Sequence, residues 1–148
     1  MWRLSVMAST LKINTLTGVS TAGSIAVTGE GNSTTTNLQQ GLCKMWIHFN
    51  GTGTIATDDS FNSSGITDVD TGAYTISFTN SMANTSYTVT GSGKEDTSNS
   101  HTGSSADRRF NPARVPLATG DVKVIGANMD TSFRDLEEVY TVLHGDLA

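Results

Sequence analysis

Residues 44–54 read KMWIHFNGTGT, and this stretch decides the fold class. Three apolar residues, Met45, Ile47 and Phe49, alternate with other side chains, which is the period of two that a β-strand with one buried face requires. The two glycines that follow allow a tight turn into a further extended segment. The stretch therefore predicts a strand over 44–50 that begins the hydrophobic core.

The same alternation recurs further along the chain. It predicts strands at 74–79, 87–90 and 122–125, with the first of them preceded by a turn at 70–72. We expect the strand at 87–90 to continue a meander from the strand at 74–79. The sequence therefore predicts an all-β fold, either a compact antiparallel β-sandwich or a small, jelly-roll-like barrel.

The C-terminal stretch fits two structures. Apolar residues at 133, 136, 140 and 143 have helical spacing and follow a candidate cap at Ser132. Over 138–144, however, Val139, Thr141 and Leu143 alternate with their neighbours, and β-branched residues are frequent. We favour a terminal strand.

Two segments between the predicted strands lack this alternation. The stretch 94–109 has one apolar residue, Ala106, and predicts a long surface loop. The following stretch, 110–117, holds both prolines of the chain and suits an edge strand or an irregular extended segment.

The composition agrees with strands and loops. Thr, Ser, Gly and Asn occupy 65 of the 148 positions, whereas charged residues make up 16%. The residues that fill surface helices are scarce, which excludes a helix bundle.

The formal net charge of −5 argues against electrostatic binding to nucleic acid, which needs a basic face. No apolar stretch is long enough for a membrane helix.

The first forty residues contain few apolar side chains, and such a segment buries too little to fold alone. Leu11 and Ile13 alternate with polar residues, and Ile25 and Val27 flank an alanine, so two short strands are expected. Because isolated short strands are marginal in water, we predict that these four residues serve in anchoring and assembly by pairing with another chain. The alternative for the free protein is an N-terminus without fixed structure.

Apolar residues become more frequent after the first forty residues. This change in composition divides the chain into an extended N-terminal arm, 1–40, and an antiparallel β domain, 41–148. A polar chain of this size has a small core, so we expect part of its stability to come from neighbouring copies. Residues 1–7 lack the apolar run of a signal peptide. Either Met1 or Met7 can be the first residue translated.

The sequence offers no well-formed catalytic or metal-binding pattern. His48, His101 and His144 are far apart in the chain, which favours surface or interface histidines, although one histidine per copy at a threefold axis would give three ligands. The single cysteine, Cys43, can form no internal disulfide and has no neighbouring base in the sequence. We therefore predict a protein that is not an enzyme and binds neither a cofactor nor a metal ion.

A family resemblance rests on several stretches. They are STLKINT (9–15), TNLQQGLCKMWIHFNGTGTIATDDSFN (36–62), GITD (65–68), TGAYTISF (71–78) and VLHGD (142–146). In this arrangement the chain resembles a module of virion proteins of marine tailed bacteriophages, including fibre-like proteins of cyanophages. The pattern W-x-x-F-N-G-T-G-T at 46–54 is its most specific part.

The resemblance implies a non-enzymatic, β-rich and trimeric structural component of the virion. The short chain favours a tail-fibre or spike-like appendage subunit, attached to other virion proteins by its N-terminal arm. Its outward β domain would contact the host surface and its glycans, with Trp46, Tyr74 and His101 as candidate contact residues. The alternative is a capsid decoration or cement protein (head fibre) that stabilises the shell. A carbohydrate-processing enzyme is the least favoured alternative, since no pair of carboxylates stands out.

Overall fold

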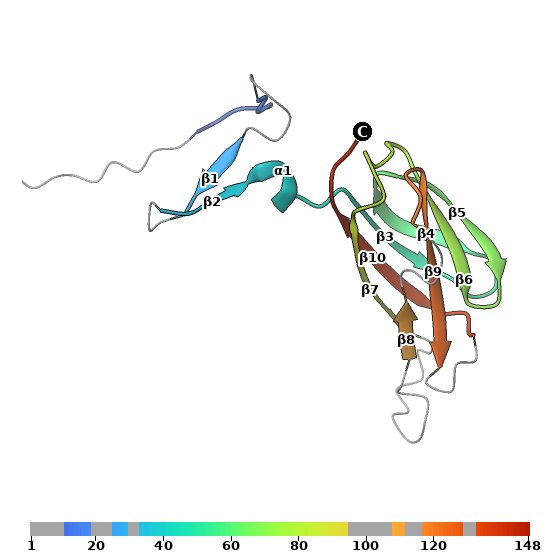
Figure 1. The fold of residues 1–148 in the computed structure, drawn as a ribbon. Coiled ribbons are helices and arrows are strands. Elements are labelled where there is room, and N and C mark those ends of the chain that lie inside the picture. The colour runs from blue at the N-terminus through green and yellow to red at the C-terminus, as the bar shows by residue number, and fades with distance from the viewer. Residues whose placement is uncertain (1–10, 19–24, 30–32, 95–107, 112–116, 129–132) are drawn as a thin grey trace, which may run out of the picture. The chain divides into compact units, whose positions relative to one another are not determined.

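The computed structural model describes residues 11–18, 25–29, 33–94, 108–111, 117–128 and 133–148. The chain divides into two compact units, Met1–Leu38 and Gln39–Ala148. The second unit contains the hydrophobic core and consists of two four-stranded antiparallel sheets (Figure 1). The predicted all-β fold is therefore confirmed for the part of the chain that the structure describes.

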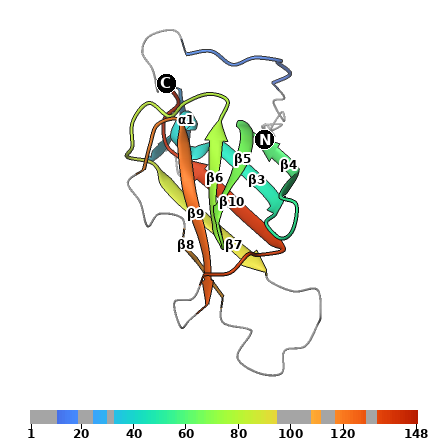
Figure 2. The same cartoon turned by 90° about the vertical axis from the view of Figure 1, so that its right-hand side faces the viewer.

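The two sheets form a sandwich. One has the strand order β4-β3-β10-β7 and the other the order β5-β6-β9-β8, and Figure 2 shows the second sheet in front of the first. The elements of this unit are β3 (Met45–Asn50), β4 (Ala56–Phe61), β5 (Ser63–Asp70), β6 (Ala73–Phe78), β7 (Thr88–Lys94), β8 (Arg108–Asn111), β9 (Asp121–Asn128) and β10 (Glu138–His144). A single-turn helix, α1 (Leu38–Gly41), precedes them in the chain.

The sheets do not close into a barrel, so that alternative is wrong. β4 and β7 are the edges of one sheet, and β5 and β8 are the edges of the other. The first and last strands of the sandwich are paired, as in a jelly roll. Strand β6 pairs with β9, and β7 and β8 lie beside β10 and β9, so the strand order is jelly-roll-like once the edge strands β4 and β5 are set aside.

The predicted alternation fills the core from both sheets. Strand β9 contains the predicted segment 122–125, and β3 and β6 cover all but one residue of the predicted segments 44–50 and 74–79. Alternate residues of these three strands are buried. The buried apolar residues are Met45, Ile47, Phe49, Tyr74, Ile76, Phe78, Met82, Tyr87, Val122, Val124, Leu136, Val139 and Leu143. Phe49 and Tyr74 join the two sheets in an edge-to-face contact, with 5.2 Å between ring centroids.

Strand β10 has the bounds predicted for the terminal strand, 138–144, and the helical alternative is wrong. Its alternate residues, Val139, Thr141 and Leu143, are fully buried. The strand pairs with β3 on one side and with β7 on the other. Pairing on both sides satisfies its backbone groups and places the β-branched residues in the extended conformation that they favour.

The meander predicted after β6 is wrong. Strand β7, which covers most of the predicted segment 87–90, pairs with β10 in the opposite sheet, and β6 pairs with β9 instead. Strand β5 was not predicted at all. It lies at a sheet edge, its residues are mostly exposed and polar, and two register shifts interrupt its pairing with β6, so it shows no apolar alternation.

Asn62 forms the corner at which the chain passes from β4 to β5. Its φ of 59° lies in the left-handed region, which asparagine tolerates better than most residues. Its side-chain amide donates to the carbonyl oxygens of Lys44, at 2.9 Å, and Asn80, at 3.0 Å. Its side-chain oxygen accepts the Asn80 backbone N–H at 2.7 Å. One side chain thus joins segments that adjoin both sheets.

The hydroxyl group of Tyr74 joins three segments at one end of the core. It accepts the backbone N–H of Leu136 at 3.2 Å. It lies 3.0 Å from the carbonyl oxygen of Gly51 and 3.2 Å from Oδ1 of Asp135, each of which can accept its proton. Oδ1 of Asp135 also accepts the Gly72 N–H at 2.6 Å. Burial is the main reason that the pKa of Tyr74 is raised above its ordinary value.

The first unit contains a two-stranded antiparallel sheet of β1 (Ala26–Thr28) and β2 (Thr35–Asn37), in which Val27 pairs with Thr36. The strand predicted around Ile25 and Val27 overlaps β1, whereas the described residues 11–18 form no strand. The described side chains of this unit are exposed, except for three that are partly buried (Ile25, Asn37 and Leu38). The predicted boundary at residue 40 and the role of this segment stay predictions.

We expect that Gly51→Ala destabilises the sandwich by about 3 kcal/mol, because overpacking of a buried site costs on this order. A Cβ atom at position 51 would lie 2.4 Å from the Tyr74 hydroxyl oxygen and 2.9 Å from the Leu136 carbonyl oxygen. Urea unfolding measures the loss. Gly120→Ala is the matched control, because its Cβ meets nothing within 4 Å, and its stability should change by less than about 1 kcal/mol. Equal losses in the two variants would contradict the role of Gly51.

Candidate functional site

The outer face of the sheet β4-β3-β10-β7 is the candidate site. Alternate residues of β3 are buried, so Trp46 and His48 stand on the outer face. The same alternation in β10 places Glu138, Tyr140 and Val142 there. Because β3 and β10 are adjacent strands in the middle of the sheet, these side chains meet across the strand boundary.

His48 and Tyr140 are direct register partners, and their rings are stacked. The ring centroids lie 4.3 Å apart, and the ring planes differ by 11°. Nε2 of His48 is buried without a hydrogen-bond partner, and it lies 3.6 Å from Oδ2 of Asp58 on β4. The imidazole is thus held between an aromatic ring and a carboxylate.

Two hydrogen bonds link Tyr140, Glu138 and Lys94 and hold the hydroxyl end of the Tyr140 side chain. The Tyr140 hydroxyl group donates to Oε2 of Glu138 at 2.6 Å, and Nζ of Lys94 lies 3.3 Å from Oε1 of the same carboxylate. These two hydrogen bonds, the one from Tyr140 first, hold the pKa of Glu138 below its usual range. The hydrogen bond to Glu138 is also the main cause that raises the pKa of Tyr140.

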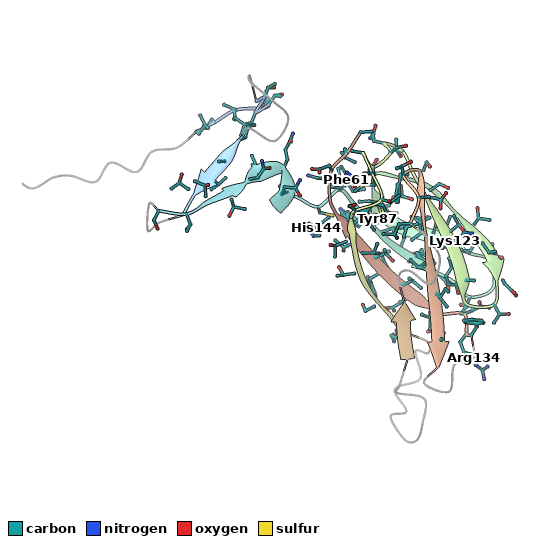
Figure 3. The ribbon with its side chains drawn as sticks, viewed as in Figure 1. Phe61, Tyr87, Lys123, Arg134 and His144 are labelled. Atoms are coloured by element: carbon teal, nitrogen blue, oxygen red, sulfur yellow. The ribbon has the colours of Figure 1, made fainter. Side chains whose placement is uncertain are left out.

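A second aromatic pair lies on the same face, toward one end of the strands. Trp46 and Phe61 are register partners in β3 and β4, and Phe61 is 50% exposed. Figure 3 shows Phe61 and His144 at the same end of the sandwich. The outer face therefore combines aromatic side chains with carboxylates and one lysine.

Of the three residues predicted to contact a partner surface, the structure places one on this face. Trp46 is partly exposed there. Tyr74 as a contact residue is wrong, because it is 1% exposed and its hydroxyl group is used inside the molecule. His101 lies outside the described residues. The alternation over 44–50 predicts Lys44 on the face of Trp46, but Lys44 is only 6% exposed, and its Nζ donates to the carbonyl oxygen of Gln39.

The four residues predicted to anchor the chain lie in the first unit. Leu11 is 76% exposed, Ile13 and Val27 are about half exposed, and Ile25 is partly buried. Their function in assembly stays a prediction.

Tyr140, Glu138 and Asp58 were not predicted as members of the candidate site. Alternation in 138–144 does indicate that Tyr140 faces away from the core. What the sequence does not indicate is that β10 lies beside β3, about ninety residues earlier in the chain, and this register alone brings Tyr140 onto His48.

No group of three or more His, Cys, Asp or Glu side chains comes together as metal ligands within the described residues. His48 and His144 both lie in strands of the same sheet, and His101 is outside the described part of the chain. The described helical segment is too short and too polar to cross a membrane. The chain matches no protein-family model, no curated protein and no solved structure.

We expect Tyr140→Phe to raise the pKa of Glu138 toward its ordinary value of 4.5, and Lys94→Met to raise it less, because the tyrosine hydrogen bond is the larger cause. A lowered pKa in the folded state stabilises the fold above pH 4.5, and this contribution is lost as the pH falls through the folded-state pKa. Carbon-detected NMR titration of the Glu138 carboxyl group measures both shifts. A larger rise in Lys94→Met than in Tyr140→Phe would contradict this order of causes.

Proposed function

We propose that this chain is a non-enzymatic structural subunit of a bacteriophage virion, a short tail-fibre or spike-like appendage subunit. Its first unit attaches it to a larger virion protein, its sandwich faces outward toward the host surface, and three copies associate. The resemblance of 36–62 to phage fibre-like proteins supports this proposal, and so does the division of the chain into two units.

The observation that carries the proposal is the exposed apolar surface of the first unit. Leu11, Ile13 and Val27 are uncovered, although each would be stabilised by removal from water. A two-stranded sheet is marginal on its own. A partner protein that covers these side chains would therefore order the segment and bind it at the same time.

The mode of attachment that fits this segment is strand addition. In the described part of the first unit, β1 and β2 are neighbours only of each other, so each strand has a second edge that borders no described strand. An edge of this kind accepts a strand of another protein through backbone hydrogen bonds, and side chains such as Val27 supply the specificity.

A capsid decoration subunit is the competing function. The same exposed segment would then clamp neighbouring shell proteins, and the virion would carry many copies. The number and position of bound copies separate the two functions.

We expect that deletion of residues 8–36 abolishes incorporation into particles while the sandwich stays folded. The deletion removes the exposed apolar residues but none of the core. Particles that lack the protein are mixed with the intact or the shortened chain, and bound copies are counted by quantitative gel analysis and located by electron microscopy. We expect at least a tenfold loss of bound copies and an unchanged urea midpoint.

A triple variant sharpens this test. Replacement of Leu11, Ile13 and Val27 by Ser should weaken incorporation as the deletion does, whereas Val69→Ser, at an exposed apolar residue of the sandwich, should not. Incorporation of the shortened chain at the level of the intact chain would refute the attachment role. A few copies at the tail support an appendage, and hundreds over the shell support decoration.

A further inference from the structure

The ring of Tyr140 has one covered face and one open face. Its register partner on β3, His48, stacks on one side. On the other side of β10, its register partner on β7 is Ser92, which is exposed. Because the stacked rings stand between the two neighbouring strands, the second face of Tyr140 is turned toward β7. Ser92 is too small to cover that face, so no described register partner of Tyr140 covers it.

The residues of β7 around this open face are small and hydroxylated. Thr90 pairs with Val142 and Ser92 pairs with Tyr140, and both β7 residues are exposed. One pair further along, Lys94 lies opposite Glu138. We call Tyr140, Ser92, Glu138 and Lys94 the tyrosine platform.

The platform is fixed before any ligand binds. The stacking on His48 sets the plane of the Tyr140 ring, and the hydrogen bond to Glu138 holds its hydroxyl end. Lys94 holds the second carboxylate oxygen. An immobilised aromatic ring surrounded by donors and acceptors suits a ligand that has one apolar face and hydroxyl groups at its rim, because preformed contacts cost less ordering on binding.

The charges around the platform restrict the ligand further. Asp58 and Asp59 stand on the β4 side, Glu138 stands on the platform, and Lys94 is already paired with Glu138. The remaining negative charge repels sialylated, sulfated or phosphorylated sugars and leaves neutral sugars unaffected.

We propose that the tyrosine platform binds the ring of a neutral hexose, whose C–H face stacks on the open face of Tyr140 while its hydroxyl groups pair with Glu138, Lys94 and Ser92. The inference rests on the proposed function for the source of the sugar, a glycan of the host surface. It places the contact on the outer face of the sheet β4-β3-β10-β7, where Trp46 also stands, and not at the buried Tyr74.

The test uses the full-length protein on an array of glucose-, galactose-, mannose- and N-acetylhexosamine-terminated glycans, with sialylated, sulfated and phosphorylated glycans beside them. We expect binding to at least one neutral class and none to the anionic classes. The neutral glycan with the strongest signal is then titrated by calorimetry against the variants.

Tyr140→Ala removes the ring. Ser92→Trp covers the open face of the ring, and because Ser92 is exposed and outside the core, this substitution should leave the fold intact. Both should weaken binding by about tenfold or more, the scale of one aromatic contact. Tyr140→Phe keeps the ring but loses the hydrogen bond that holds its hydroxyl end, so it should weaken binding less than Tyr140→Ala does. Phe61→Ala is the matched control, because it removes an exposed aromatic residue from the same face but not from the platform.

Three outcomes would overturn the inference: no binding of any neutral glycan, unchanged binding by Ser92→Trp, or a smaller oligomer in Ser92→Trp by light scattering, which would make the face a contact between copies. Ser92→Trp should still enter particles as the intact protein does. Normal incorporation without sugar binding refutes the platform alone, and sugar binding without incorporation refutes the virion function alone.

Discussion

The pairing of β3 with β10 is the constraint on which the rest of the sandwich depends. The two strands come from opposite ends of the second unit, yet they are in register from Val139 opposite Phe49 to Leu143 opposite Met45. Their inner faces supply one wall of the core, and their outer faces bring Tyr140 onto His48. Since side chains alternate with a period of two, a slip by one residue would exchange the core with the surface.

The sequence predicted those strands whose two faces differ in polarity. In β3, β6, β9 and β10 one face is apolar because it covers the core, and this difference is visible as alternation. Strand β5 has no such face, since it runs along a sheet edge and exposes most of its residues. The order of the strands was not predictable in the same way, because it depends on pairings between segments far apart in the chain.

The candidate site was predictable only where one strand determines it. Trp46 follows from the alternation of 44–50 alone. Tyr74 was wrongly assigned to the surface although it shares the phase of Ile76 and Phe78, so the same alternation already indicates its burial. Tyr140 faces outward by its own pattern, but its stacking partner and its open face are set by β3 and β7, which only the folded structure brings together.

In the two proposals, attachment and recognition belong to different units of the chain. A single sugar ring on an open sheet face buries little surface, so one platform alone binds weakly. Under these proposals, several copies on one particle would present several platforms to the same surface, and the second contact would then form at a high effective concentration, which raises the overall affinity by a factor on the order of 10²–10⁴. Weak single-site binding is therefore compatible with firm attachment of the particle. In this arrangement the carboxylates beside the platform act mainly by excluding anionic glycans, because specificity is a difference between affinities and repulsion contributes to it as much as attraction does.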